Sequence, residues 1–129
     1  MAVTFHGPFG DGDRSKVYGT FDVLVVPSIW PENSPFVVHE AFLARRPVIA
    51  ARMGGLPELV ADGVCGRLYE ATSAAELAAA IEELLATPGT LRRWIQAIPP
   101  VKSLDDDVQE WEARYRTFVG RRTPVEQPA

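Results

Sequence analysis

Two glutamates separated by seven residues are the part of this 129-residue sequence best suited to chemistry. Glu32 lies in a proline-framed loop, "PSIWPENSP", and Glu40 lies among the apolar residues of "PFVVHEAFLARR". A carboxylate in an apolar setting destabilises the folded state unless it is paired or hydrogen-bonded. Adjacent hydroxyls of a sugar such as ribose offer two donors to one carboxylate. The pattern therefore favours a polyol ligand for Glu40.

Short apolar runs must form the elements that position these glutamates. The runs "DVLVVP" and "PVIAA", residues 22–26 and 47–51, are almost uninterruptedly apolar, which is typical of strands covered on both faces of a parallel sheet. Further strands are predicted at residues 3–6 and 67–69, and helices at 14–19, 35–45 and 56–61. This alternation predicts an α/β fold with a doubly wound parallel sheet and right-handed crossovers.

The loop after residues 22–26 is predicted to lie at the carboxyl edge of that sheet, where open α/β sheets bind ligands. It contains Ser28 and Glu32. Ser34 followed by Pro35 predicts an N-cap and a proline at the first helical position. The free N–H groups of this helix, together with its dipole, suit an anion such as the diphosphate of a sugar nucleotide.

A second loop, "ARMGGLPELV", follows the next predicted strand. Gly54 and Gly55 permit close approach of the backbone. Glu58 falls in the first turn of a helix, where the dipole alone can explain an acid, so a ligand role and a structural role are about equally favoured for it. Taken singly, Glu32 is better explained as a solvated loop acid than as a ligand-binding residue. We expect His39 on the exposed side of its helix.

After residue 69 the pattern is helical. "TSAAELAAAIEELLATPG" begins with a capping box, Ser73 and Glu76, and "TLRRWIQAI" forms a second helix. A third helix is predicted from the N-cap Ser103. Its apolar stripe is expected to pack into the core: Leu104, Val108, Trp111, Tyr115 and Phe118. We expect residues 1–120 to form one partial domain and residues 121–129 a disordered tail.

Composition excludes several classes of function. A net charge of -4 and a pI near 5.1 provide no basic field for nucleic acid or an anionic membrane. The single cysteine and the spacing of His6 and His39 argue against a metal site. No apolar run of about eighteen residues or signal peptide is present, so a cytoplasmic location without a transmembrane segment is expected. The arginine pairs are interpreted as solvated helix ends: Arg45 and Arg46, Arg92 and Arg93, Arg121 and Arg122.

No G-x-G-x-x-G motif or P-loop opens the sequence. The glycine-rich "GPFGDGD" contains Asp11 and Asp13, which would repel a phosphate, and it is interpreted as a turn. The chain is therefore expected to be the later part of a larger α/β unit.

A family resemblance joins these motifs. "DVLVVPS", Glu32, seven residues, Glu40-Ala41 and "RRPVIAARMGGLPELVADGVCGRLY" follow one another in order. Over about residues 22–85 the chain resembles the C-terminal, donor-binding domain of retaining glycosyltransferases of the GT-B architecture. It is similar to the group 1, family 4 type, which includes sucrose synthases, glycogen synthases and bacterial transferases of cell-envelope glycan assembly. The resemblance implies a Rossmann-like fold, the C-terminal half of the GT-B architecture truncated at its N-terminus.

The resemblance also implies site residues. Glu32 would be the catalytic residue that contacts and orients the transferred sugar, and Glu40 would bind the nucleotide ribose. The remaining donor-binding positions would be Asn33, Ser34, Pro35, Phe36, Ser28, Gly54 and Gly55. Many members carry Gly-Phe-Gly after the first glutamate, whereas Pro35 here lacks an N–H. The reaction implied is transfer from a nucleoside-diphosphate sugar with retention, without metal or other cofactor.

The family's diphosphate-gripping basic residues and its catalytic histidine have no counterpart in these residues. The isolated fragment is therefore expected to be inactive without an N-terminal acceptor-binding domain as partner. For the parent protein, a peripheral position at the inner face of the membrane is compatible with the resemblance. One alternative is a non-catalytic nucleotide-sugar-binding or interaction module. A GT-B sugar epimerase is a weaker alternative, because such enzymes do not usually carry this glutamate pair. The base, the sugar and the acceptor stay open.

Overall fold

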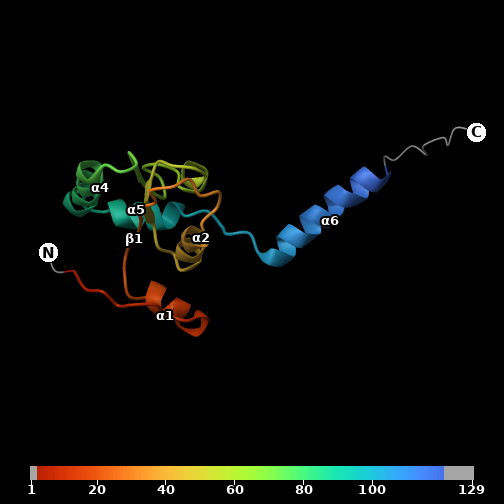
Figure 1. Cartoon of the computed structure of the whole chain (residues 1–129), viewed down its shortest axis with the longest axis horizontal. Helices are drawn as coiled ribbons and strands as arrows, with labels where there is room; N and C mark the ends of the chain where they lie inside the picture. Colours follow the sequence, from red (N-terminus) through yellow and green to blue (C-terminus); the bar gives the residue numbers. More distant parts are fainter. Residues whose placement is uncertain (1–2, 121–129) are drawn as a thin grey trace, which may run out of the picture.

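A three-stranded parallel sheet forms the centre of the computed structural model, which describes residues 3–120 (Figure 1). Its strands lie in the order β1 (Leu24–Val26), β2 (Val48–Ala51) and β3 (Gly66–Tyr69). Leu24 lies opposite Val48, and Val48 lies opposite Gly66. The parallel sheet predicted from the apolar runs is confirmed.

Helices cover both faces of the sheet. The 3-10 turn Asp11–Asp13 and α1 (Arg14–Tyr18) precede β1, while α2 (Phe36–Leu43) and α3 (Leu56–Leu59) form the crossovers. Helices α4 (Ala74–Ala86), α5 (Thr90–Ala97) and α6 (Leu104–Gly120) follow β3. Two clusters of buried side chains result, one with α2 and α3 and the other with α4 and α5.

Strand β2 shows why apolar and polar residues do not alternate in residues 47–51. Val48 and Ala50 pack with α2 and α3, whereas Ile49 and Ala51 pack with α4 and α5. All four residues are buried, because successive side chains of a strand point to opposite faces and both faces are covered here.

The turn between α3 and β3 is held from two sides. Trp94 of α5 donates its indole N–H to the carbonyl of Gly63, 3.2 Å away. The Asp62 carboxylate accepts the N–H of Leu68 at 2.9 Å and pairs with Arg52 at 2.9 Å. Burial opposes ionisation of Asp62, but the Leu68 N–H and the neighbouring arginines hold the pKa of this carboxyl below its ordinary value.

The strand predicted at residues 3–6 is wrong. Residues 3–10 have no regular secondary structure, and both Val3 and Phe5 are exposed. A strand is stable when its backbone groups pair with a neighbour and one of its faces is buried. This segment does not pair with any strand of the sheet, so its backbone groups have no strand partner and its apolar side chains have no sheet face to pack against.

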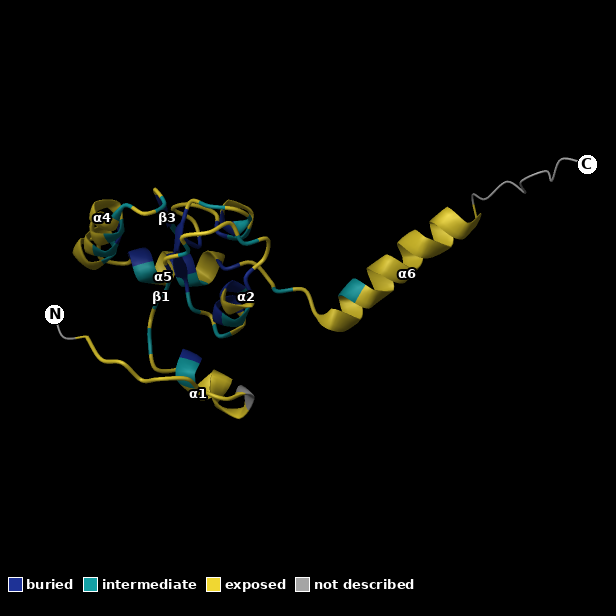
Figure 2. Ribbon diagram, in the orientation of Figure 1, coloured by how far each residue is buried: buried dark blue, intermediate teal, exposed yellow. Residues whose placement is uncertain are grey.

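Helix α6 exists as predicted, but its expected packing is wrong. None of residues 104–120 is buried, and the helix projects away from the sheet (Figures 1 and 2). Trp111 and Tyr115 are 49% and 64% exposed and contact each other at 6.0 Å between ring centroids. The helix is supported locally, because Ser103 accepts the N–H of Asp106 at 3.1 Å. The tail predicted at residues 121–129 lies outside the described residues.

Arg45 and Arg46 are not merely solvated helix ends. Arg45, with a φ of 59°, donates to the carbonyls of Ile95 and Ile98 at the end of α5. Arg46 donates to the carbonyl of Tyr18 at the end of α1, 2.9 Å away. Because the last carbonyls of a helix have no intrahelical partner, these bonds attach α2 to both neighbours.

Candidate functional site

The two loops that follow β1 and β2 meet at the carboxyl edge of the sheet. Glu32 is partly buried, and its Oε1 accepts a hydrogen bond from the Ser28 hydroxyl at 2.5 Å. The N–H of Gly55, from the second loop, donates to the carbonyl of Glu32 at 2.7 Å. The carboxylate and the backbone of Glu32 are therefore both held in place.

Gly54 and Gly55 lie directly against the Glu32 loop. A Cβ on Gly54 would lie 2.4 Å from the Glu32 carbonyl oxygen, and one on Gly55 would lie 1.8 Å from that of Asn33. Gly54 also has a φ of +54°, which favours glycine. The close approach expected at these glycines is thus made to the loop that carries Glu32.

Helix α2 begins one residue later than predicted. Pro35 occupies the N-cap position, and its carbonyl accepts the N–H of Val38 at 3.1 Å. The prediction of Ser34 as the N-cap is therefore wrong. The Ser34 hydroxyl instead bonds to Nε2 of His39 at 2.8 Å, so His39 lies half-buried against the loop.

An open pocket of about 510 Å³ lies at this helix end. The pocket is lined by six consecutive residues, which include Glu32 and the four predicted donor-binding residues that follow it: Glu32, Asn33, Ser34, Pro35, Phe36 and Val37. The first N–H groups of α2 have no intrahelical acceptor, and the helix dipole adds partial positive charge. The pocket can therefore accept an anion beside a fixed carboxylate.

Glu40 lies one turn further along α2 and outside the lining of this pocket. Its Oε2 accepts the Tyr18 hydroxyl at 2.7 Å, and its Oε1 pairs with Arg14 at 2.8 Å. The side chain of Glu40 is 22% exposed. Burial, and then the hydrogen bond to Glu40, raise the pKa of Tyr18 to about 12, so the phenol remains a donor at neutral pH.

Sequence reasoning did not identify Arg14 and Tyr18. The signal that could have found them is their spacing, because residues four apart share one face of a helix. What that face contacts is decided by the position of α1 beside α2, which no local pattern records.

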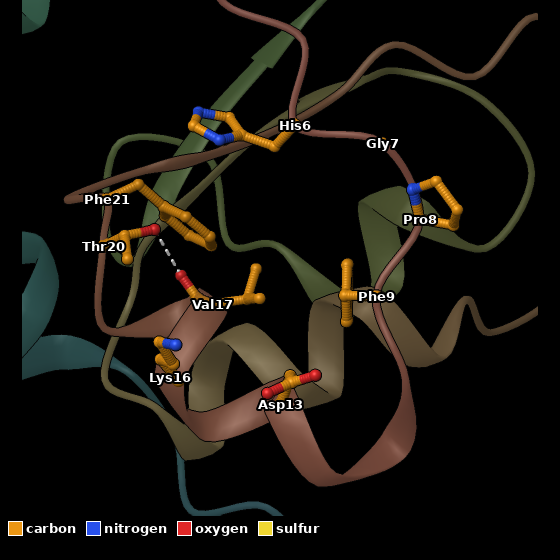
Figure 3. A pocket seen from close by; sticks show the side chains of 9 residues that line it. All are labelled: His6, Gly7, Pro8, Phe9, Asp13, Lys16, Val17, Thr20 and Phe21. Atoms are coloured by element: carbon orange, nitrogen blue, oxygen red, sulfur yellow. Dashed lines mark hydrogen bonds between the residues drawn. The ribbon is translucent and has the colours of Figure 1, made fainter.

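A second pocket, of about 550 Å³, lies between α1 and the segment that precedes it (Figure 3). The segment from His6 to Phe9 passes over it, and Asp13, Lys16 and Val17 of the α1 region line its floor. Neither Glu32 nor Glu40 lines this pocket, so it is separate from the glutamates.

Two other classes of site are absent from residues 3–120, a metal centre and a membrane-spanning helix. No group of three or more histidine, cysteine, aspartate or glutamate side chains could hold a metal ion there. No helix in the same part of the chain is long and apolar enough to cross a membrane.

The sequence profile of the family described as "Glycosyl transferases group 1" matches residues 1–99. D-inositol 3-phosphate glycosyltransferase of Mycobacterium sp. (strain KMS) is 40% identical over 92 residues, which are 70% of this chain and 21% of that protein. The protein of that name from Actinosynnema mirum is 38% identical over 87 residues, 67% of this chain and 21% of the relative. The chain thus spans about a fifth of the length of these curated relatives.

Solved structures show the same fold. Sucrose-phosphate synthase from Thermosynechococcus elongatus matches with a TM-score of 0.74 and 29% identity, over 91% of this chain and 30% of that one. Anabaena Alr3699/HepE in complex with UDP-glucose matches with a TM-score of 0.71 and 26% identity, over 81% and 30%. These likenesses confirm the predicted doubly wound, Rossmann-like α/β fold.

Proposed function

Because the chain belongs to the glycosyl transferases group 1 family, we propose that it forms part of the donor site of a retaining glycosyltransferase that uses a nucleoside-diphosphate sugar. Membership confirms the resemblance identified from the glutamate motif. The observation that carries the proposal is the meeting of the Glu32 loop and the α2 N-terminus around one pocket. A solved relative by fold, Alr3699/HepE, holds UDP-glucose, which supports a sugar nucleotide as ligand.

Glu32 orients the transferred sugar in this proposal. The Ser28 hydroxyl donates a hydrogen bond to one carboxylate oxygen of Glu32. Because an ionised carboxylate has about four acceptor positions, Glu32 can still accept hydrogen bonds from sugar hydroxyls. The Gly55 N–H and the close packing of Gly54 hold the loop. A carboxylate fixed in this way loses little conformational freedom when the sugar binds.

The N-terminus of α2 binds the diphosphate. As the bond from the anomeric carbon to the phosphate oxygen breaks, its electron pair passes to the diphosphate, and the sugar becomes oxocarbenium-like. The N–H groups at the start of α2 stabilise this growing negative charge. The acceptor hydroxyl then bonds to the same face of the sugar and gives its proton to the departing phosphate. Retention of configuration follows from attack on the face that the leaving group vacates.

Glu40 binds the ribose in the same proposal. In the absence of ligand, Tyr18 donates to one of its oxygens and Arg14 pairs with the other. The acceptor and the rest of the diphosphate site are assigned to parts of the parent protein outside these 129 residues, because the matched segment is only about a fifth of the length of the relatives. No metal ligand or cofactor is assigned.

Calorimetric titration of the chain with UDP-, GDP- and ADP-sugars tests the donor role. We expect one class to bind, and Glu40→Ala or Glu32→Ala to weaken it by about tenfold or more, since a hydrogen bond to a charged group contributes about 1.5–3 kcal/mol. Glu58→Ala, an exposed acid at the start of α3, is the matched control and leaves the affinity unchanged. Binding that ignores both substitutions would remove the proposed site.

An assay for transfer distinguishes part of a transferase from a complete one. Incubated with the bound nucleotide sugar and simple acceptors, the chain alone is expected to form no glycoside. Product formation by these 129 residues would refute the assignment of the acceptor side to another part of the parent protein.

A further inference from the structure

One face of α1 contacts Glu40 with two side chains of different character. Tyr18 is 4% exposed, and its ring lies 5.4 Å from that of Phe21 in the core beneath α2. Arg14, one helical turn earlier, has a side chain that is 51% exposed. Neither residue is part of the glutamate motif by which the family resemblance was identified.

We propose that Tyr18 is the positioning residue that fixes the Glu40 carboxylate, and that Arg14 covers the second oxygen until a ribose diol displaces it. This inference rests on the proposed ribose role of Glu40. On this proposal, the Tyr18–Glu40 hydrogen bond persists when ligand binds, whereas the Arg14–Glu40 ion pair is replaced by hydrogen bonds from the ribose.

The contacts of Tyr18 make it the fixed member. Its hydroxyl lies 2.7 Å from Oε2 of Glu40 and 3.5 Å from the carbonyl of Val37, one turn earlier on α2. Its own carbonyl accepts the guanidinium N–H of Arg46 at 2.9 Å. Tyr18 is thus attached to α2 and to the segment just after it, and its buried ring cannot leave without opening the core.

The setting of Arg14 makes it the exchangeable member. It belongs to a five-residue helix, and its guanidinium meets Oε1 of Glu40 at 2.8 Å near the solvent. Exposed ion pairs contribute little to stability because water solvates both charges well. Two hydroxyls on adjacent carbons can donate to a carboxylate in the same way as a guanidinium, so a ribose is a competent replacement.

The test compares UDP with 2′,3′-dideoxy-UDP by calorimetry, and repeats the comparison with the ADP and GDP pairs. The ratio of the two dissociation constants isolates the ribose hydroxyls, because base and diphosphate are common to both ligands. We expect the wild-type chain to prefer UDP by about tenfold, and Glu40→Gln to abolish that preference. Tyr18→Phe keeps the buried ring and is expected to lower the ratio severalfold while leaving dideoxy-UDP affinity unchanged.

Arg14→Gln is expected to act in the opposite direction. Removing the competing guanidinium should strengthen UDP binding by about threefold, with dideoxy-UDP unaffected. Tyr115→Phe and Arg116→Gln are the matched controls, because both lie on α6 and Arg116 pairs with an exposed carboxylate of its own, Glu112. Neither control should change either dissociation constant.

The outcomes separate the two proposals. A wild-type ratio near one for all three bases, or no binding at all, overturns the ribose role of Glu40 and this inference with it. A wild-type preference that Glu40→Gln removes and Tyr18→Phe preserves overturns the positioning role alone. If Arg14→Gln weakens both ligands equally, Arg14 binds the diphosphate, and its displacement by ribose is refuted.

A ligand-free measurement checks the contact itself. In a double-mutant cycle of Tyr18→Phe and Glu40→Gln, unfolded by urea, the two changes are expected to couple by about tenfold in the unfolding equilibrium constant. Additive effects would show that the two side chains do not interact, and would overturn the positioning role without any ligand.

Discussion

Alanine in place of Gly55 should displace the loop that carries Glu32. Gly55 has an ordinary φ of -80°, so backbone conformation does not oppose the change. The new Cβ would lie 1.8 Å from the carbonyl oxygen of Asn33, whereas separations under 3.0 Å are essentially never seen, so the loop must move by more than 1 Å. Overpacking of this kind costs about 1–3 kcal/mol, and we expect the upper part of that range because the neighbour is backbone.

Alanine substitutions at two other glycines separate the cost of a left-handed backbone from the cost of a steric clash. Gly63 has a φ of +73°, and an alanine Cβ there would have no neighbour within 4 Å, so Gly63→Ala should cost only the left-handed conformation, about 1–2 kcal/mol. Gly54 combines a φ of +54° with a contact of 2.4 Å to the Glu32 carbonyl oxygen. Gly54→Ala should therefore cost about the sum of the other two effects, roughly 3–5 kcal/mol.

Urea unfolding of the three variants gives these free energies, and calorimetric titration with the sugar nucleotide gives the effect on the site. Gly55→Ala should weaken binding because Glu32 moves, whereas Gly63→Ala should not. A Gly55→Ala variant as stable as the wild type, with unchanged affinity, would refute the packing of the two loops. Equal losses of affinity in Gly55→Ala and Gly63→Ala would show a general effect of stability.

Two further predictions concern elements that hold the site. The pKa of Asp62 is lowered, so its carboxylate stabilises the folded state above the ordinary value of 3.8, and this contribution is lost as the pH falls through the lower folded-state value. Asp62→Asn should flatten the decline of the urea midpoint below about pH 4, and an unchanged decline would contradict the Asp62–Leu68 contact. Arg45→Ala should destabilise the chain by about 1–3 kcal/mol, because the carbonyls of Ile95 and Ile98 lose a charged donor. Arg45→Lys should recover only part of this loss in thermal unfolding, since one ammonium group cannot reproduce the geometry of two guanidinium bonds.

The sequence alone was sufficient for features that depend on neighbouring residues. The strands within residues 22–26 and 47–51 were predictable because a parallel sheet covered on both faces leaves nearly uninterrupted apolar runs. Ser73 and Ser103 marked helix starts because an N-cap acts within one turn. The order of strand, loop and helix also placed Glu32 at the carboxyl edge of the sheet.

Features that depend on a distant partner were decided by the tertiary structure. Apolar periodicity predicted α6 but could not show that Trp111 and Tyr115 would remain exposed, because the same stripe suits any apolar neighbour. The question raised by Glu40 had an answer outside its own helix, in Tyr18, twenty-two residues away. The spacing of apolar residues along the sequence indicates which face of a helix or strand is apolar. The hydrogen-bond partner of a partly buried acid depends instead on how two elements pack against each other. The sequence therefore determined where the two acids lie along the chain, and only the folded arrangement determined what holds each of them.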